Sequence, residues 1–336
     1  MKKTISRYLL DIWYKDHFIG TALLPLGFLY SDFAKFHRWL YKIGHYKSEN
    51  LSVPVIVVGN ITVGGTGKTP LCIHLAKLLT KEGYRVGIIS RGYGGETTTK
   101  MVLPTSKISE VGDEALLIIQ QTDCPMAVGA KRAEAGKFLL KNTPCDVILA
   151  DDGLQHYALK RDIEIAVIDG DRRFGNNICL PAGPLREPIE RLNSVDFVVV
   201  NGEPAENTAW HEWQMQLMGD ITINLKTGEK KPLTEFKNVS CHAIAGIGNP
   251  ERFFKQLEKA GISKRTDHSF PDHHVFTADE IVFKNECVFM TQKDAVKCQN
   301  FATENHWVVP VTVHLSAEFT ANFLTLFKSK LLRETL

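Results

Sequence analysis

A glycine-rich loop between an apolar run and an amphipathic segment constrains this chain more than any other feature. The apolar run Val53–Val58 leads directly into Gly59–Pro70, which reads GNITVGGTGKTP, and leucines then recur at helical spacing over Leu71–Leu79. A strand, a glycine loop and a helix in this order form the context of a phosphate-binding loop. The glycines let consecutive backbone N–H groups point into one concavity, and the helix N-terminus adds positive dipole character. We therefore expect this segment to bind nucleotide phosphates.

The residue types within the loop have separate chemical tasks. Lys68 is placed to reach the β and γ phosphates, and the Thr69 hydroxyl is placed to ligate Mg²⁺. The strict pattern GxxxxGK[ST] requires glycine where this chain has Thr62, and the pair Gly64-Gly65 is expected to supply the flexibility instead. An ordinary glycine turn would not explain Gly-Lys-Thr at this offset from a strand. The predicted nucleotide-binding residues of the loop are Thr62, Val63, Gly64, Gly65, Thr66, Gly67, Lys68, Thr69 and Pro70.

Short β-branched runs alternate with longer amphipathic segments after residue 50. Continuous apolar strands separated by helices predict an α/β fold with a doubly wound, mostly parallel sheet of the P-loop NTPase type. We expect this catalytic domain to cover 51–206, a strand-turn-strand connection to cover 207–235, and a smaller α/β domain to cover 236–336. The strands predicted in the first domain are Val53–Val58, Arg85–Ile89, Pro125–Val128, Asp146–Ala150, Ile163–Ile168 and Asp196–Val200.

An acidic pair, Asp151 and Asp152, follows the predicted strand Asp146–Ala150 directly. Ligands of doubly wound sheets bind at the carboxyl ends of the strands, and in P-loop enzymes an acid at this place organises Mg²⁺. We therefore predict that both acids contact the nucleotide and its metal. A strand-end Asp that only caps the next helix is the alternative, and it applies to Asp169 as well.

The first fifty residues differ in composition from the rest of the chain. They contain eight Lys and Arg against four Asp and Glu, and eleven of the 31 aromatic residues. Apolar residues recur at steps of four and three from Leu29 to Ile43, with Lys35, Arg38 and Lys42 on a neighbouring face. This pattern is typical of an amphipathic helix at a membrane surface, and packing of the helix on its own domain is the alternative. We predict a membrane-associating helical arm over residues 1–50.

The overall composition excludes several classes of protein. Charged residues make up 23% of the 336 residues and the net charge is +2, which argues against an integral membrane protein and against disorder. The longest uncharged apolar stretch near the N-terminus, Phe18–Ser31, is too short to span a bilayer. Seven cysteines without a CxxC pair predict neither a disulfide framework nor a thiolate zinc site, so a reducing cytosol fits best.

Eight segments in one order resemble the tetraacyldisaccharide 4′-kinases of lipid A biosynthesis, which phosphorylate the distal sugar of an acylated glucosamine disaccharide. Individually most of the segments are weak signals, but together they are specific, and they cover the chain from about residue 50 to residue 297. They are TVGGTGKTP (Thr62–Pro70), SRGYG (Ser90–Gly94), VGDE (Val111–Glu114), DDGLQH (Asp151–His156), LPAGPLREP (Leu180–Pro188), GIGNPERFF (Gly246–Phe254), FPDHH (Phe270–His274) and TQKDAVK (Thr291–Lys297).

The resemblance implies ATP and Mg²⁺ as cofactors and gives a role to residues in most of these segments. The catalytic residues of the family fall on Lys68 and on Asp113, which is the proposed base, backed by His273. The implied nucleotide-binding residues include Asp151 and Asp152, and the implied metal neighbours are Thr69, Asp151 and Glu187. The implied substrate contacts are Arg91, Tyr93, Arg132, Gln155 and His156.

The implied reaction is the ATP-dependent phosphorylation of the 4′-hydroxyl of a tetraacylated glucosamine disaccharide 1-phosphate. It implies a peripheral protein on the cytoplasmic face of the inner membrane, with no nucleic acid and no obligatory protein partner. Asp113 and His273 stand 160 positions apart, one in each predicted domain, so domain closure could assemble them only when substrate is bound.

Two other functions remain open from the sequence. One is a membrane-associated P-loop ATPase switch that a protein partner activates, and the other is a kinase of a soluble metabolite. A GTPase is disfavoured because Thr291–Asp294 reads TQKD and does not match the guanine-reading pattern NKxD. A zinc site at His273 and His274 is also disfavoured, because no other His or Cys lies at ligand spacing around them.

Overall fold

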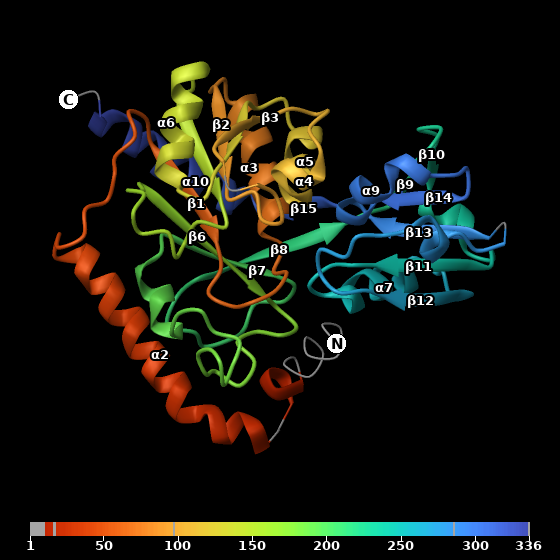
Figure 1. Ribbon diagram of the computed structural model, residues 1–336, viewed down its shortest axis with the longest axis horizontal. Coiled ribbons are helices and arrows are strands. Elements are labelled where there is room, and N and C mark those ends of the chain that lie inside the picture. The colour runs from red at the N-terminus through yellow and green to blue at the C-terminus, as the bar shows by residue number, and fades with distance from the viewer. Residues whose placement is uncertain (1–10, 16–17, 97, 285, 335–336) are drawn as a thin grey trace.

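The computed structural model describes residues 11–15, 18–96, 98–284 and 286–334. Residues 1–10 and 16–17 of the predicted arm lie outside this described part. The chain forms a large lobe around a nine-stranded sheet and a small lobe around a six-stranded sheet (Figure 1). Both sheets are mostly parallel, so the α/β fold predicted from the sequence is confirmed.

The large sheet contains all six strands predicted for the first domain, each within two residues of its expected bounds. Its central strands are fully buried, as expected for apolar runs covered by helices on both faces. Only the edge strands β3 and β15 run antiparallel to their neighbours. The strand order is β15 (Thr312–Leu315), β8 (Glu212–Met218), β7 (Phe197–Asn201), β6 (Ile163–Asp169), β1 (Val55–Gly59), β5 (Val147–Asp151), β2 (Val86–Ser90), β4 (Met126–Val128) and β3 (Lys100–Val102).

Helices cover both faces of the large sheet. On one face the apolar sides of α3 (Lys68–Lys81), α5 (Asp113–Gln121) and α10 (Ala317–Glu334) share one core cluster with alternate strand residues. On the other face lie α6 (Arg132–Asn142) and loop residues from the second half of the lobe. The short helix α4 (Ile108–Val111) precedes α5.

The small lobe has its own sheet and two core clusters. Its strand order is β10 (Lys230–Pro232), β9 (Ile221–Asn224), β14 (His306–Val309), β13 (Cys287–Thr291), β11 (Cys241–Ala245) and β12 (Arg265–Ser269). Helix α7 (Pro250–Lys259) packs on one face, and α8 (Ala278–Ile281) with α9 (Gln292–Cys298) packs on the other. Short 3-10 turns occupy Ile189–Ser194, Leu233–Phe236 and Gln299–Phe301.

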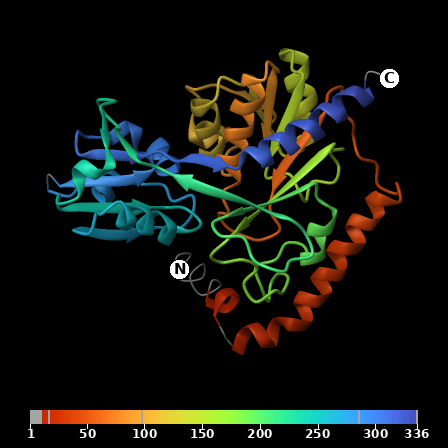
Figure 2. The ribbon, with the colours of Figure 1, turned by 180° about the vertical axis from the view of Figure 1, so that it is seen from behind.

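The division between the lobes differs from the expected division at residue 236. Strand β8 belongs to the large sheet and β9 to the small sheet, and the chain returns to the large sheet at β15. Helix α10 then crosses the large lobe (Figure 2), where Phe319, Phe323 and Phe327 are fully buried. Each buried phenylalanine stabilises this docking by about 1.5–3 kcal/mol. Periodicity reveals an amphipathic helix but not the sheet that it covers, which is why the sequence did not assign α10 to the large lobe.

Helix α2 (Phe18–Lys42) lies along the outer edge of the large lobe (Figure 1). It contacts the lobe through a small residue, since a Cβ on Gly27 would lie 2.8 Å from Cγ2 of Ile178. Tyr30 also packs on the core of the lobe, but many of the large apolar side chains of the helix point outward, and Phe18, Leu29 and Phe33 are each more than 60% exposed. Within the described residues, no helix has the length and hydropathy needed to cross a membrane.

Candidate active site

The phosphate-binding loop joins β1 to α3 as the sequence predicts. Gly64 and Gly67 have φ angles of 109° and 99°, a left-handed conformation that glycine adopts without steric cost. The side-chain amide of Asn201, at the end of β7, donates to the carbonyl of Thr66 at 3.1 Å and so connects the loop to the sheet. A Cβ on Gly67 would lie 2.6 Å from that amide nitrogen, and the φ of 99° at this position is the stronger reason for glycine.

Lys68 and Thr69 begin α3 and face the acidic pair at the end of β5. Lys68 Nζ lies 3.5 Å from an oxygen of Asp152, and the Thr69 hydroxyl donates to Asp151 Oδ2 at 3.4 Å. Asp152 has a φ of 50°, a left-handed conformation that costs a non-glycine residue free energy and that the surrounding contacts must hold. Arg186 lies 3.3 Å from the Asp152 carboxylate on its other side.

The two acids titrate in opposite directions. Burial and the negative charges of Glu114 and Asp152 raise the pKa of Asp151, despite the nearby Lys68. Burial would also raise the pKa of Asp152, but Lys68 and Arg186 lower it to about 2. Asp151 is therefore harder to ionise than Asp152, and a cation bound beside it would be stabilised by the surrounding negative charges and would favour its ionised form.

The residues around Asp151 fit a magnesium ion. Oδ1 of Asp151 is buried and has no hydrogen-bond partner, although a buried carboxylate oxygen normally has one. Mg²⁺ typically takes one or two protein oxygens and completes its shell with phosphates and water. The described residues contain no group of three His, Cys, Asp or Glu that could hold a metal ion by itself.

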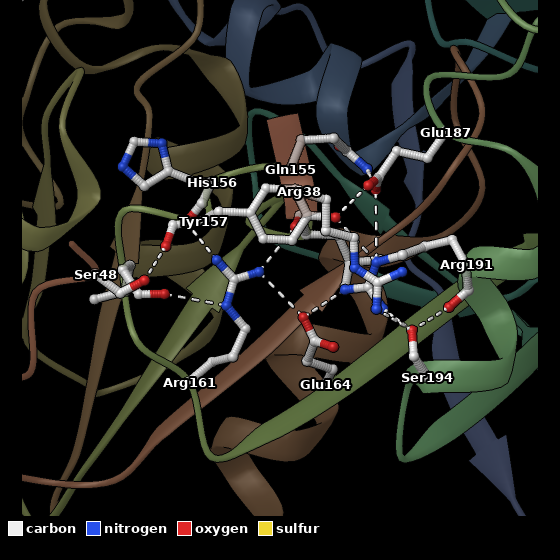
Figure 3. A network of polar contacts seen from close by, with 12 residues as sticks. Arg38, Ser48, Gln155, His156, Tyr157, Arg161, Glu164, Glu187, Arg191 and Ser194 are labelled. Atoms are coloured by element: carbon white, nitrogen blue, oxygen red, sulfur yellow. Dashed lines mark hydrogen bonds and ion pairs between the residues drawn. The ribbon is translucent and has the colours of Figure 1, made fainter. Parts of the chain in front are cut away.

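Glu187 is held by a network of polar side chains instead of being open to solvent (Figure 3). Gln155 donates to its Oε2 at 2.9 Å and Tyr157 donates to its Oε1, while Gln155 also donates to the carbonyl of Asn60 at 2.9 Å. Arg191 lies 3.8 Å from the same carboxylate. Both oxygens of Glu187 therefore have protein donors, and Gln155 links this acid to the start of the phosphate-binding loop.

Asp113 and His273 meet across the two lobes. His273 Nδ1 lies 2.9 Å and 3.0 Å from the two carboxylate oxygens of Asp113, which begins α5 and is 3% exposed. His273 has a φ of 58°, a second strained non-glycine residue. Its neighbour His274 makes a different contact, a 3.0 Å bond to Glu280 inside the small lobe.

The pKa values of this pair move apart. Burial would raise the pKa of Asp113, but the hydrogen bond with His273 and the charge of Lys293 lower it overall. Burial would lower the pKa of His273, and its bond with Asp113 raises it overall. Each group therefore stabilises the charged form of the other, as in a pair that can accept one proton.

The predicted substrate contacts lie around these two centres. Tyr93 is 59% exposed and its ring centroid lies 4.7 Å from that of His273, while Arg91 is exposed at the end of β2. Arg132 is 4% exposed and donates to the carbonyl of Asp152. Its Nε is a buried donor without a hydrogen-bond partner, so it is available to bind an anion. His156 Nε2 accepts the backbone N–H of Arg132.

Three residues of the site were not predicted from the sequence. Arg186 and Lys293 lie inside segments that were recognised, and their ion pairs with Asp152 and with Glu114 and Asp272 appear only in three dimensions. Asp169 was considered only as a helix cap. Its position at the carboxyl end of Ile163–Ile168, beside the phosphate-loop strand, was the available signal.

Three comparisons relate the chain to known proteins. Residues 19–328 match the family described as tetraacyldisaccharide-1-P 4′-kinase. The chain is 47% identical over 326 residues to the tetraacyldisaccharide 4′-kinase of Nitrosococcus oceani, covering 96% of this chain and 95% of that protein. It is 46% identical over 319 residues to the tetraacyldisaccharide 4′-kinase of Mannheimia succiniciproducens, covering 94% of this chain and 97% of that protein.

The fold comparison agrees. The crystal structure of LpxK from Aquifex aeolicus in complex with ATP superposes with a TM-score of 0.77 and 31% sequence identity, covering 92% of this chain and 99% of that one. The family match over residues 19–328 includes both lobes and every segment of the site.

Proposed function

The chain belongs to the tetraacyldisaccharide 4′-kinase family, and from this premise we propose how its residues transfer the γ-phosphoryl group of ATP. The acceptor is the 4′-hydroxyl of a tetraacylated glucosamine disaccharide 1-phosphate, a lipid A precursor. The observation that carries the residue assignment is the contact of His273 with Asp113. This contact brings one proton-accepting group from each lobe to the same place.

Asp113 and His273 act together as the general base. As the bond between the γ-phosphorus and the 4′-oxygen forms and the bond to the β–γ bridging oxygen breaks, the hydroxyl proton passes to this pair and ADP leaves. The transition state of phosphoryl transfer is loose, so the proton is needed only late, and a base contributes about 10²- to 10⁴-fold. The hydrogen bond with His273 and the positive charge of Lys293 lower the pKa of Asp113 against the effect of burial and keep its carboxylate ionised until then.

The loop residues supply the electrostatic part of catalysis. Lys68 and the loop N–H groups stabilise charge on the transferring group, and Arg132 offers its unpaired donor to a phosphate oxygen. Thr69 and Asp151 would hold Mg²⁺, which neutralises phosphate charge when bound. Glu187 would be a neighbour of this ion, held in place by its own hydrogen-bond network. This assignment is supported by the unpartnered Oδ1 of Asp151.

The acid limb of the pH–rate profile tests the base. Because the pKa of His273 is raised above its ordinary 6.5, His273 becomes protonated below that raised value and the pair can no longer accept a proton. We therefore expect kcat/KM to fall with decreasing pH and the midpoint of this fall to lie above pH 6.5. In Asp113→Asn, the residual activity should show a midpoint at lower pH, since the carboxylate that raises the pKa of His273 is gone.

His274→Gln is the matched control for the pH experiment, because His274 contacts Glu280 and not Asp113. Its acid limb should coincide with that of the unmodified enzyme. An unchanged midpoint in Asp113→Asn would refute the paired base.

The rival ATPase switch makes a different prediction about nucleotide turnover. For a kinase whose base is assembled across two lobes, we expect little ATP hydrolysis until the acylated disaccharide is added, after which one ADP forms per phosphorylated lipid. A switch would instead hydrolyse ATP on addition of a protein partner, and a kinase of a soluble metabolite would not respond to the lipid. Release of ADP measured with and without the lipid distinguishes the three functions.

Helix α2 is proposed to hold the enzyme on the cytoplasmic face of the inner membrane, where the acceptor lies. The outward position of its apolar side chains supports this. A groove of about 220 Å³ between α2 and the segment Glu187–Arg191 is lined by the basic residues Lys35, Arg38 and Lys42 of the helix and by Glu187, Glu190 and Arg191 of the lobe. Each basic residue near an anionic surface adds about 1 kcal/mol to membrane binding.

Substitution of two exposed phenylalanines tests this membrane contact. Phe33 and Phe36 are 64% and 55% exposed, so their replacement costs the folded protein little. Phe33→Ser with Phe36→Ser should lower cosedimentation with anionic vesicles by about tenfold or more, because two apolar side chains no longer enter the bilayer. Val275→Ser, at an 81% exposed apolar residue of the small lobe, should bind as the unmodified protein does. Equal vesicle binding by the unmodified protein, the double phenylalanine variant and Val275→Ser would contradict the proposal.

A further inference from the structure

A loop of the small lobe lies directly on the phosphate-binding loop. A Cβ on Gly248 would lie 2.2 Å from the backbone nitrogen of Gly65, so the two backbones touch at a distance that only glycine allows. Nη2 of Arg172, which follows β6, donates to the carbonyl of Gly248 at 2.9 Å and to that of Gly65 at 3.4 Å. This arginine therefore ties the small-lobe loop and the phosphate-binding loop together.

Asp169 is the centre of this contact. It is 2% exposed, ends β6 beside the phosphate-loop strand, and pairs with Arg172 of its own loop at 3.4 Å. Two residues reach it from the small lobe: Arg252 at 2.8 Å and Asn249 at 3.0 Å. The ring of Tyr14 lies 5.6 Å from the Arg172 guanidinium and covers the ion pair. A buried carboxylate with donors from both lobes is held strongly only while the lobes are together.

The covalent connection between the lobes consists of two short crossings. The chain crosses between the sheets twice, from β8 to β9 and from β14 to β15. The two crossings lie side by side, since a Cβ on Gly219 would lie 2.5 Å from the carbonyl oxygen of Pro310. Two short adjacent crossings are typical of a hinge, and at such a connection contacts elsewhere in the interface hold the lobes in one arrangement.

We propose that Asp169 and Arg252 are positioning residues that latch the small lobe onto the phosphate-binding loop. Neither contacts the reacting atoms. Their ion pair holds the lobes in the arrangement in which His273 reaches Asp113, and Arg252 also donates to the carbonyl of Asn201, whose amide supports the phosphate-binding loop. This inference rests on the proposed function, because latching matters for catalysis only if the pair across the lobes is the base.

A double-mutant cycle with a direct measurement of lobe closure tests the latch. Arg252→Gln and Asp169→Asn are each expected to lower kcat by about tenfold, and the double variant by about tenfold as well, because each change breaks the same pair. Closure is measured by energy transfer between dyes at Lys81→Cys on α3 and Lys255→Cys on α7, in a Cys287→Ser background. The other six cysteines are buried. With a non-hydrolysable ATP analogue bound, the labelled Arg252→Gln variant should show lower transfer efficiency than the labelled protein that keeps Arg252.

Two further variants keep the result interpretable. Arg265→Gln removes an arginine that pairs with Asp267 inside the small lobe, and it should change neither kcat nor transfer efficiency. Gly248→Ala removes no charge but adds a Cβ that overlaps Gly65, so it should reproduce the Arg252→Gln result even if Asp169→Asn does not fold.

Two outcomes would overturn the latch: an unchanged transfer efficiency in both Arg252→Gln and Gly248→Ala, or a hundredfold loss in the double variant, which would mean two independent effects. Full activity of Asp113→Ala would refute the proposed base instead, and the energy-transfer result would still decide whether the latch exists.

Discussion

Lys68→Ala is expected to lower kcat for phosphoryl transfer by about 10²- to 10³-fold, the usual cost of removing one donor that stabilises transition-state charge. Lys68 is the first residue of α3, and its ammonium group lies 3.5 Å from Asp152 at the mouth of the loop. The fold should tolerate the change, because Asp152 keeps its contact with Arg186. Initial rates of lipid phosphorylation at saturating ATP measure the effect.

The control for this variant lies on the same helix. Lys77 is exposed on α3 and away from the loop, so Lys77→Ala removes an equal charge without removing a phosphate contact. It should retain the activity of the unmodified enzyme. Equal rates for Lys68→Ala and Lys77→Ala would mean that the glycine loop is a structural turn rather than a phosphate site.

Asp113→Ala should lower kcat by about 10²- to 10⁴-fold, because the pair that accepts the hydroxyl proton is lost. His273→Gln should have an effect of the same kind, and the double variant should be little worse than Asp113→Ala, since two residues that act as a unit are not additive. Rates measured under single-turnover conditions separate this chemical effect from product release.

Two neighbouring residues serve as controls for the base. His274→Gln changes the adjacent histidine, whose contact is with Glu280, and Asp123→Asn changes an exposed acid beyond the end of α5. Both should remain active. A His274→Gln variant as impaired as His273→Gln would show that the whole Phe270–His274 loop matters and not the pair with Asp113.

The phosphate-binding half of the site was predictable because its signals are local. A strand, a glycine loop with Gly-Lys-Thr and a helix lie within thirty residues of one another, and each residue type has one chemical task. The acidic pair Asp151 and Asp152 follows from the rule that ligands bind at the carboxyl ends of parallel strands. The structure adds that Asp152 is strained, with a φ of 50°, which no sequence pattern indicates.

The half of the site that depends on the small lobe was not predictable from residue patterns. Asp113 is one acid at the start of a short helix, and only the family resemblance selected it; its contact with His273 joins residues 160 positions apart. Lys293 and Arg252 reach the large lobe only because the lobes dock as they do. The division of the chain at residue 236 differs from the observed one for the same reason, since α10 returns to the large lobe.

Transfer of a labelled γ-phosphate to an acylated glucosamine disaccharide in detergent micelles with Mg²⁺-ATP tests the central claim most directly. We expect the label to enter the lipid at its 4′ position, one label for each ADP formed, and to be nearly absent from the lipid with Lys68→Ala. Label that appears only as inorganic phosphate, with none in the lipid, would contradict the account.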